Sequence, residues 1–227
     1  MRYRDFQQIM SNQRMNRYLL ACKRNSRKAM TLYRLNLRLS QEMFTVISCF
    51  EVALRNLIDQ HYTNLQGADW LRDAASRGGR FDNRNCNYTA RTINDVVNKL
   101  GVNYAHGKVV AELGFGFWRY LFSRHQYRAA GQTLISVFPS LPSSTPTMQY
   151  NSIFIYNELA KTNNIRNRIA HHEAICFLPT VPIKNTIFAR QNYAHVKQLF
   201  QWMNIDEGAL LYGLDHIINV CNQIDAL

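Results

Sequence analysis

The sequence feature that most constrains the fold is a series of apolar residues spaced three and four apart across residues 27–64. Such spacing places side chains on one face of an α-helix, because the helix turns once every 3.6 residues. The residues on this face are Leu32, Leu35, Leu39, Met43, Val46, Phe50, Ala53, Leu57 and His61. The spacing therefore predicts one long helix with a single buried stripe, preceded by Asn25-Ser26 as a candidate cap.

Further segments show helical patterns, whereas the alternating pattern of β-strands is scarce. The ranges predicted to be helical are 3–21, 90–101, 148–173, 189–204 and 206–225. Loops are predicted for the polar stretch 65–90, for the proline-rich stretch 139–147, and from Pro179 and Pro182 to about residue 187. We therefore expect an all-α fold, a helical bundle with an extra N-terminal helix and long loops.

The charge of the chain is unevenly distributed. Net charge is +12, and residues 1–40 hold ten Lys or Arg and one acid, whereas residues 203–227 hold four acids and no Lys or Arg. A basic segment attracts anionic polymers, and RNA fits because phosphate contacts supply most non-specific affinity. The alternative is a solvated basic helix face that binds no nucleic acid. The candidate RNA-binding residues are Arg14, Arg17, Lys23, Arg24, Arg27 and Lys28.

The length of 227 residues suits one domain with a small appendage, so we predict a basic arm over 1–25 and a helical domain over 26–227. No apolar run approaches the 18 or so residues that span a membrane, and the basic N-terminus lacks the apolar core of a secretory signal. The five cysteines are scattered without a Cys-x-x-Cys pair. We expect a cytoplasmic protein that uses no metal or other cofactor and does not contact a membrane.

Residues 165–175, Ile-Arg-Asn-Arg-Ile-Ala-His-His-Glu-Ala-Ile, carry the clearest candidate chemistry. Arg166 is a permanent cation that binds phosphate, and His171 or His172 has a side chain that exchanges protons near neutral pH. Asn167 shares a helical face with His171, whereas Arg166 lies about 140° round a regular helix. This set suits metal-free cleavage of RNA. The alternative is a capped helix end with a solvated pair of histidines.

The Arg-to-His spacing alone is not diagnostic. The 20 Arg and 7 His of the chain form five Arg-x(4–6)-His pairs, where roughly two are expected by chance. The pairs outside residues 165–175 are Arg55/His61, Arg119/His125 and Arg190/His195. Glu51 and Arg55 are spaced for an ion pair on one helical face, which we favour over a second half-site at Arg55 and His61. We interpret the other two pairs as surface residues.

Three ordered elements resemble one protein family. Residues 166–173 resemble the signature of Abi-like proteins, the bacterial abortive-infection AbiD/AbiF group, which belongs to the HEPN superfamily with its Arg-polar-x(3)-His hallmark. Residues 50–56 (Phe-Glu-Val-Ala-Leu-Arg-Asn) are similar to the family's early helix, and residues 113–118 (Leu-Gly-Phe-Gly-Phe-Trp) to its Gly-Phe-Trp element. The resemblance implies an all-α fold and a metal-independent endoribonuclease, acting in phage defence or as a toxin.

The resemblance also implies a homodimer that pairs two motifs across its axis. Arg166 would hold the scissile phosphate, His171 would act as general acid and base, and Asn167 would orient His171 or bind phosphate. His172, Glu51 and Arg55 are possible supporting residues. Expected partners are RNA, a second copy of the chain, and an antitoxin or phage-derived trigger. The alternatives are a non-catalytic HEPN-type module that binds RNA, nucleotide or protein, and a purely structural all-α homodimer.

Overall fold

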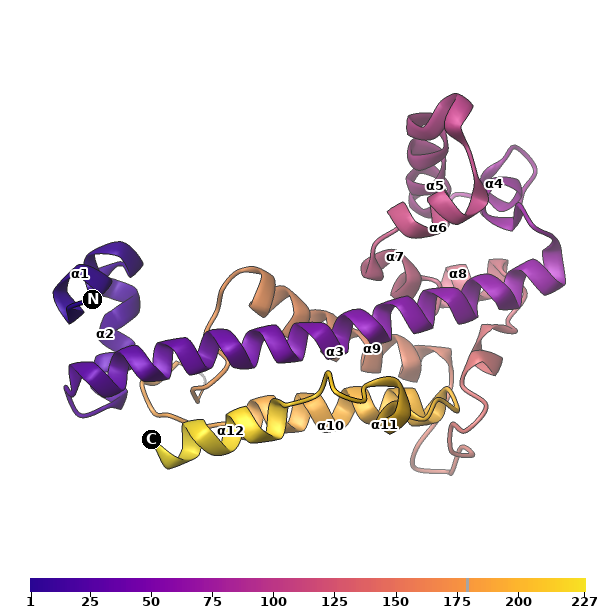
Figure 1. Cartoon of the computed structure of the whole chain (residues 1–227). Helices are drawn as coiled ribbons and strands as arrows, with labels where there is room; N and C mark the ends of the chain where they lie inside the picture. The colour runs from indigo at the N-terminus through magenta and orange to yellow at the C-terminus, as the bar shows by residue number, and fades with distance from the viewer. Residues whose placement is uncertain (179) are drawn as a thin grey trace. The chain divides into compact units, whose positions relative to one another are not determined.

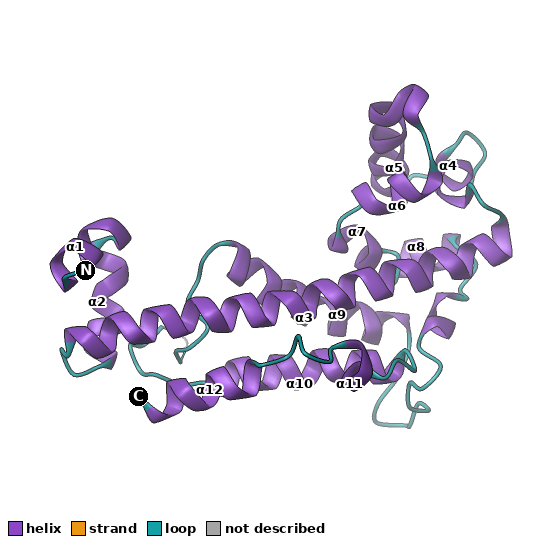
Figure 2. Ribbon diagram, in the orientation of Figure 1, coloured by secondary structure: helices purple, strands orange, loops and turns teal. Residues whose placement is uncertain are grey.

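The computed structural model describes residues 1–178 and 180–227, and within them the chain folds into helices joined by loops (Figure 2). Pro179, part of a predicted loop, lies outside the described residues. No β-strand occurs in the described part of the chain, where an isolated antiparallel bridge joins Phe177 to Lys184. The prediction of an all-α fold is confirmed.

The helices follow one another along the chain as labelled in Figure 1. They are α1 (Tyr3–Met10), α2 (Asn12–Ala21), α3 (Ser26–Gln66), α4 (Trp70–Ala75), α5 (Asn87–Leu100), α6 (His106–Glu112), α7 (Phe115–Tyr120), α8 (Arg124–Ala129), α9 (Ser152–Ala170), α10 (Ile187–Trp202), α11 (Glu207–Leu210) and α12 (Ile217–Ala226). Two short 3-10 helices are η1 (Gly101–Asn103) and η2 (Leu134–Val137).

The helices belong to two compact units. Unit 1 comprises Met1–Ser48, Asn164–Gln198 and Glu207–Leu227, and unit 2 comprises Cys49–Asn163 and Leu199–Asp206. The predicted division into an arm over 1–25 and a domain over 26–227 stays a prediction. Each unit has its own buried apolar side chains.

The long helix α3 begins where the sequence predicts, because the Asn25 side chain accepts a hydrogen bond of 3.0 Å from the Lys28 backbone N–H. The predicted stripe is buried at most positions from Leu32 to Phe50, except that Asn36 replaces Leu35. Beyond Phe50 the prediction is wrong by one residue. The fully buried side chains there are Leu54, Ile58 and Tyr62, in place of Ala53, Leu57 and His61. Each step of four residues rotates the buried face of α3 by about 40°. The rotated face buries bulkier side chains than the predicted face would bury.

The helices of the structure depart from the predicted ranges in several places. The predicted helix 3–21 is two helices, because Ser11 has a left-handed backbone (φ 73°) and its hydroxyl caps α2 by accepting from the Arg14 N–H. The predicted loop 65–90 contains α4, which buries Trp70 and Leu71. The predicted helix 206–225 is interrupted between α11 and α12, where Gly213 has φ 73°.

In unit 1, α12 runs antiparallel to the first part of α3. Two contacts define this direction: Lys28 Nζ donates to the carbonyl oxygen of Leu227 at 2.7 Å, and the Glu42 carboxylate accepts from the backbone N–H of His216 at 3.2 Å. The two helices therefore lie side by side, as Figure 1 also shows.

An aromatic cluster in unit 1 fixes the segment that follows α9. The ring of Tyr18 on α2 packs edge-on against Tyr33 of α3 at 5.1 Å and against Phe177 at 4.9 Å between centroids. Beside it, the buried amide of Asn36 accepts a hydrogen bond of 2.9 Å from the backbone N–H of Ile175. Side chains of α2 and α3 thus hold residues 175–177 in place.

In unit 2, Phe50 packs against Phe115 and Phe200 with centroid distances of 6.2 and 5.3 Å. Phe115 and Trp118 are buried. Within residues 1–178 and 180–227, no helix is both long and apolar enough to cross a membrane.

Candidate functional site

The motif histidines stand at the C-terminal end of α9, and hydrogen bonds define that end. The His172 N–H donates to the Ile169 carbonyl at 2.9 Å, and the Glu173 N–H donates to the Arg168 carbonyl at 2.8 Å. His172 has φ 56°, so these bonds form a Schellman motif with histidine at the left-handed position that glycine usually occupies. His172 therefore caps the C-terminal end of α9, which is one of the two roles that the sequence allowed for it.

The N-terminal helix α2 contacts the segment that this cap begins. Arg14 Nη1 donates a hydrogen bond of 2.9 Å to the carbonyl oxygen of His172. Arg17 Nη2 donates to the carbonyls of Leu178 and Val181 at 2.9 and 3.1 Å, and its guanidinium lies 4.5 Å from the ring centre of Phe177. Two of the predicted RNA-binding arginines thus lie beside the motif.

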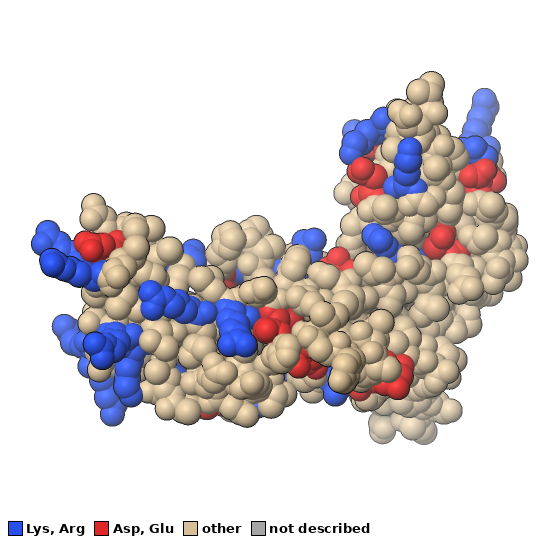
Figure 3. All heavy atoms as spheres, in the orientation of Figure 1, with Lys and Arg blue, Asp and Glu red and all other residues tan. Residues whose placement is uncertain are grey.

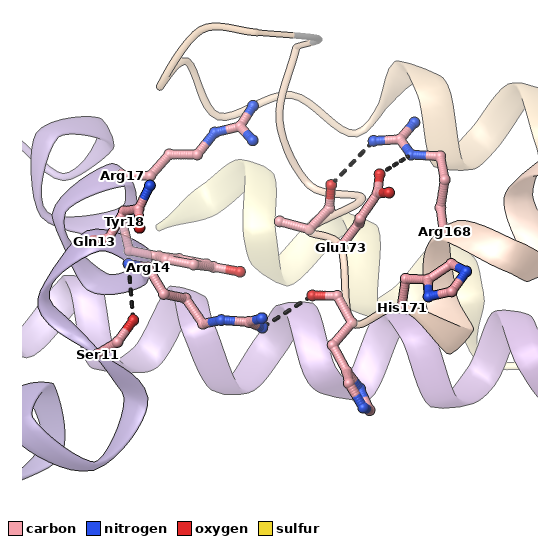
Figure 4. Close-up of a pocket in the computed structure, with 10 residues that line it drawn as sticks. Ser11, Gln13, Arg14, Arg17, Tyr18, Arg168, His171 and Glu173 are labelled. Atoms are coloured by element: carbon pink, nitrogen blue, oxygen red, sulfur yellow. Dashed lines mark hydrogen bonds and ion pairs between the residues drawn. The ribbon is translucent and has the colours of Figure 1, made fainter.

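These contacts surround a pocket of about 500 Å³ in unit 1. It is lined by Ser11, Gln13, Arg14, Arg17, Tyr18, Arg168, His171, His172, Glu173 and Ala174. Figure 4 shows α2 side chains on one side of the pocket and the end of α9 with the following residues on the other. Arg14 and Arg17, two of the predicted RNA-binding residues, therefore line the same pocket as His171.

The arginine that α9 supplies to the pocket is Arg168, which the sequence analysis missed. Its Nε lies 3.0 Å from the Glu173 carboxylate, its Nη2 donates to the Ala174 carbonyl at 3.3 Å, and its guanidinium lies 4.4 Å from the ring centre of Phe188. The sequence spacing does indicate Arg168, because it precedes His171 by three residues and His172 by four. Residues at these spacings share one face of a helix.

Arg166 and Asn167 are half-buried and, in the described part of the chain, are not among the residues that line this pocket. The helix geometry explains the difference, since five residues turn α9 by about 140° relative to His171. The Nε of Arg166 is shielded from solvent. The Asn167 carbonyl accepts the His171 N–H at 2.9 Å, so its backbone supports the last helical turn.

The other predicted RNA-binding residues lie outside the pocket. Lys23 and Arg24 are exposed in the turn between α2 and α3, with φ of 50° and 64°, and Arg27 and Lys28 are exposed on the first turn of α3. In the face shown in Figure 3, Lys and Arg side chains gather over α1, α2 and the start of α3. This end of unit 1 therefore presents a basic surface.

The supporting residues Glu51 and Arg55 are half-buried on α3 within unit 2, and their predicted role in the cleft stays a prediction. The His61 ring lies within hydrogen-bond distance of two hydroxyl groups, with Nδ1 3.3 Å from Ser136 Oγ and Nε2 2.9 Å from Thr133 Oγ1. Burial lowers the pKa of His61, because it disfavours the charged imidazolium. These contacts give His61 a structural role.

The interpretation of Arg119 and Arg190 as simple surface residues is wrong. Arg119 is half-buried, donates to the Tyr156 hydroxyl at 3.0 Å and stacks on its ring. Arg190 on α10 lies 2.9 Å from the Asp225 carboxylate on α12 and is also half-buried. Both guanidiniums hold helices together, which a search for Arg-to-His spacing does not detect.

Two titratable side chains near the pocket stay protonated at neutral pH. Burial raises the pKa of Tyr18 well above its ordinary value, so its hydroxyl remains a hydrogen-bond donor. Burial also raises the pKa of Cys176 to about 12, which suppresses the thiolate that a cysteine nucleophile requires. Among the described residues, no group of three or more His, Cys, Asp or Glu is arranged to hold a metal ion.

The pocket thus combines exposed imidazoles with guanidiniums held by backbone carbonyls, an arrangement that can bind an anion and exchange protons with it. No known family, curated protein or solved structure matches the chain in comparisons of sequence and fold.

Proposed function

We propose that the protein is a metal-independent endoribonuclease in which His171 acts as general acid and base. The observation that carries the proposal is that His171, Arg14, Arg17 and Arg168 line one pocket. A nuclease of this kind needs a proton-transferring group beside cations that stabilise a charged phosphorane. The pocket supplies both kinds of group.

The reaction uses the nucleophile that RNA carries. A base accepts the proton of the 2′-hydroxyl, the 2′-oxygen bonds to phosphorus, and the P–O5′ bond breaks as an acid protonates the leaving oxygen. The products are a 2′,3′-cyclic phosphate, which water opens to a 3′-phosphate, and a 5′-hydroxyl. Imidazole is suited to both proton transfers because it titrates near neutral pH.

The proposal extends to a homodimer, in which a second copy of His171 would serve as the opposite partner in proton transfer. In such a dimer Arg166 would hold the scissile phosphate, with Asn167 beside it. The resemblance of residues 166–173 to Abi-like proteins of the HEPN superfamily supports this arrangement. It also supports a cytoplasmic role in phage defence or as a toxin, with an antitoxin or phage-derived trigger as regulator.

The test is RNA cleavage in EDTA by wild type and His171→Ala, with analysis of the product ends. The matched control is His125→Ala, which removes an exposed histidine of unit 2. We expect cyclic or 3′-phosphate ends from wild type and the control, and none from His171→Ala, with unchanged circular dichroism. Cleavage that persists in His171→Ala would refute the assignment.

A non-catalytic RNA-binding module is the second candidate. One observation favours it: within the described residues, the His171 side chain has no hydrogen-bond partner to orient it, as a general base usually has. A binding module keeps its RNA affinity in His171→Ala and loses it when Arg14 and Arg17 are neutralised. Filter binding of RNA to these variants, measured beside the cleavage assay, separates the two candidates.

A further inference from the structure

Glu173 is the acid in a pocket otherwise lined by basic and neutral side chains. Its backbone is fixed, because its N–H completes the Schellman motif by donating to the Arg168 carbonyl at 2.8 Å. Its side chain is 53% exposed and turns back to place a carboxylate oxygen 3.0 Å from Arg168 Nε (Figure 4). An exposed carboxylate thus occupies one guanidinium in a pocket suited to anions.

Each guanidinium has anchors other than the Glu173 carboxylate. Arg168 is also held by the Ala174 carbonyl and the ring of Phe188. Arg14 is held by the His172 carbonyl, and Arg17 by two carbonyls and the ring of Phe177. These anchors carry no net charge, and each guanidinium has five N–H groups, so donors remain for a ligand. The cations are therefore preorganised and not neutralised by their anchors.

The α2 side of the pocket, which carries Arg14 and Arg17, also supplies neutral donors. The Tyr18 hydroxyl stays protonated, because burial raises its pKa. The Ser11 oxygen accepts from the Arg14 N–H, which leaves its own O–H to donate. A ligand that meets guanidinium, hydroxyl and imidazole donors together should present several acceptor oxygens and negative charge. A phosphate group has both properties, and the pocket volume of about 500 Å³ admits the nucleotide that carries it.

We propose that this pocket binds a phosphate group of a nucleic acid through Arg14, Arg17 and Arg168, and that the ligand displaces the Glu173 carboxylate from Arg168. The carboxylate acts as an intramolecular competitor that lowers affinity for anions until phosphate replaces it. The inference rests on the proposed function only in that both use the same pocket, and phosphate binding requires no cleavage.

The test measures binding to the full chain with ligands that lack a 2′-hydroxyl and so cannot be cleaved by the proposed reaction. The probes are inorganic phosphate and one fluorescent oligodeoxynucleotide, prepared with and without a 5′-phosphate. Glu173→Gln removes the competing charge and keeps the side-chain shape. Its matched control is Glu112→Gln, which makes the same change in net charge by breaking the exposed Lys99–Glu112 pair (2.7 Å) in unit 2.

We expect Glu173→Gln to bind phosphate and oligonucleotide about two- to fivefold more tightly than wild type, the range of an exposed ion pair. Arg14→Gln should bind about tenfold more weakly, as the loss of a charge-assisted hydrogen bond predicts. Arg91→Gln, which removes an exposed arginine of unit 2, should bind as wild type does. A gain in affinity is informative because a variant that fails to fold loses affinity.

The two oligonucleotides identify the source of the phosphate. A preference for the 5′-phosphorylated form assigns the pocket to a terminal phosphate, whereas equal affinity that inorganic phosphate competes away assigns it to an internal phosphodiester. Equal affinities of Glu173→Gln and Glu112→Gln for every probe overturn the proposal. If wild type cleaves RNA but these variants bind alike, the pocket inference fails and the nuclease stands. If they differ as expected but RNA is not cleaved, the nuclease fails and the pocket stands.

Discussion

The guanidinium of Arg14 donates a hydrogen bond of 2.9 Å to the backbone carbonyl of His172, which lies in the turn that caps the C-terminal end of α9. The contact joins residues 158 positions apart in the sequence. It places a cation at the negative end of the α9 dipole, where positive charge is stabilising. The basic N-terminal segment is therefore part of the candidate site as well as a charged surface.

This contact predicts that Arg14→Ala lowers the free energy of unfolding by about 1 kcal/mol, because one hydrogen bond from a charged donor at an exposed position is lost. Urea denaturation followed by circular dichroism measures the change. Arg91→Ala, at an exposed position of α5, serves as the control. Equal stability of the two variants would show that the contact does not stabilise unit 1.

The left-handed backbone of His172 predicts opposite behaviour for two small substitutions. Glycine has no Cβ to strain at φ 56°, so His172→Gly should be more stable than His172→Ala by about 1 kcal/mol. Thermal and urea unfolding of both variants measure this difference. If alanine proves as stable as glycine, strain at this position does not contribute to stability.

The buried amide of Asn36 predicts a larger effect. Asn36→Ala leaves the backbone N–H of Ile175 without its 2.9 Å acceptor, and an unsatisfied buried donor costs about 1–3 kcal/mol. Because the hydrogen bond holds the segment that follows the motif, phosphate binding in the pocket should weaken as well. Hydrogen exchange of the Ile175 amide reports the change directly. Unchanged protection of that amide would contradict the role assigned to Asn36.

The lowered pKa of His61 predicts a pH-dependent contribution to stability. Above about pH 6.5 the imidazole is neutral in both the folded and the unfolded chain. At lower pH the unfolded chain binds a proton that the folded state resists, so the free energy of unfolding falls until the pH reaches the folded-state pKa. The stability difference between wild type and His61→Gln should therefore shrink between pH 7.5 and pH 5.5. A stability difference that stays constant over this pH range, measured by urea denaturation, would contradict the effect of burial on His61.

Local patterns in the sequence predict most of the helices. The start of α3 follows from Asn25 and the apolar spacing, and the all-α class from the scarcity of alternation. The stripe prediction fails after Phe50, because both faces of the helix there carry apolar residues and packing selects the bulkier one. The break at Ser11 is also missed, since a left-handed residue other than glycine leaves no clear local signal.

Of the site residues predicted from the sequence, His171, His172, Arg14 and Arg17 line the pocket, whereas Arg166, which the motif pairs with His171, does not line it in the described part of the chain. The helix turns Arg166 away from His171, and Arg168, three residues before His171, lines the pocket in its place. Helical periodicity already places Arg166 about 140° from His171, and it places Arg168 on the same face as His171.

The sequence by itself determined the helical class, the long α3 and the concentration of positive charge near the N-terminus, because each depends on residues close together in the chain. Only the tertiary structure decided that Arg14 and Arg17 meet the end of α9, and that Glu173 turns back onto Arg168. The physical reason is that such contacts depend on which helix faces pack together. That choice is made by buried groups such as Tyr18, Asn36 and Phe177, which join distant parts of the chain.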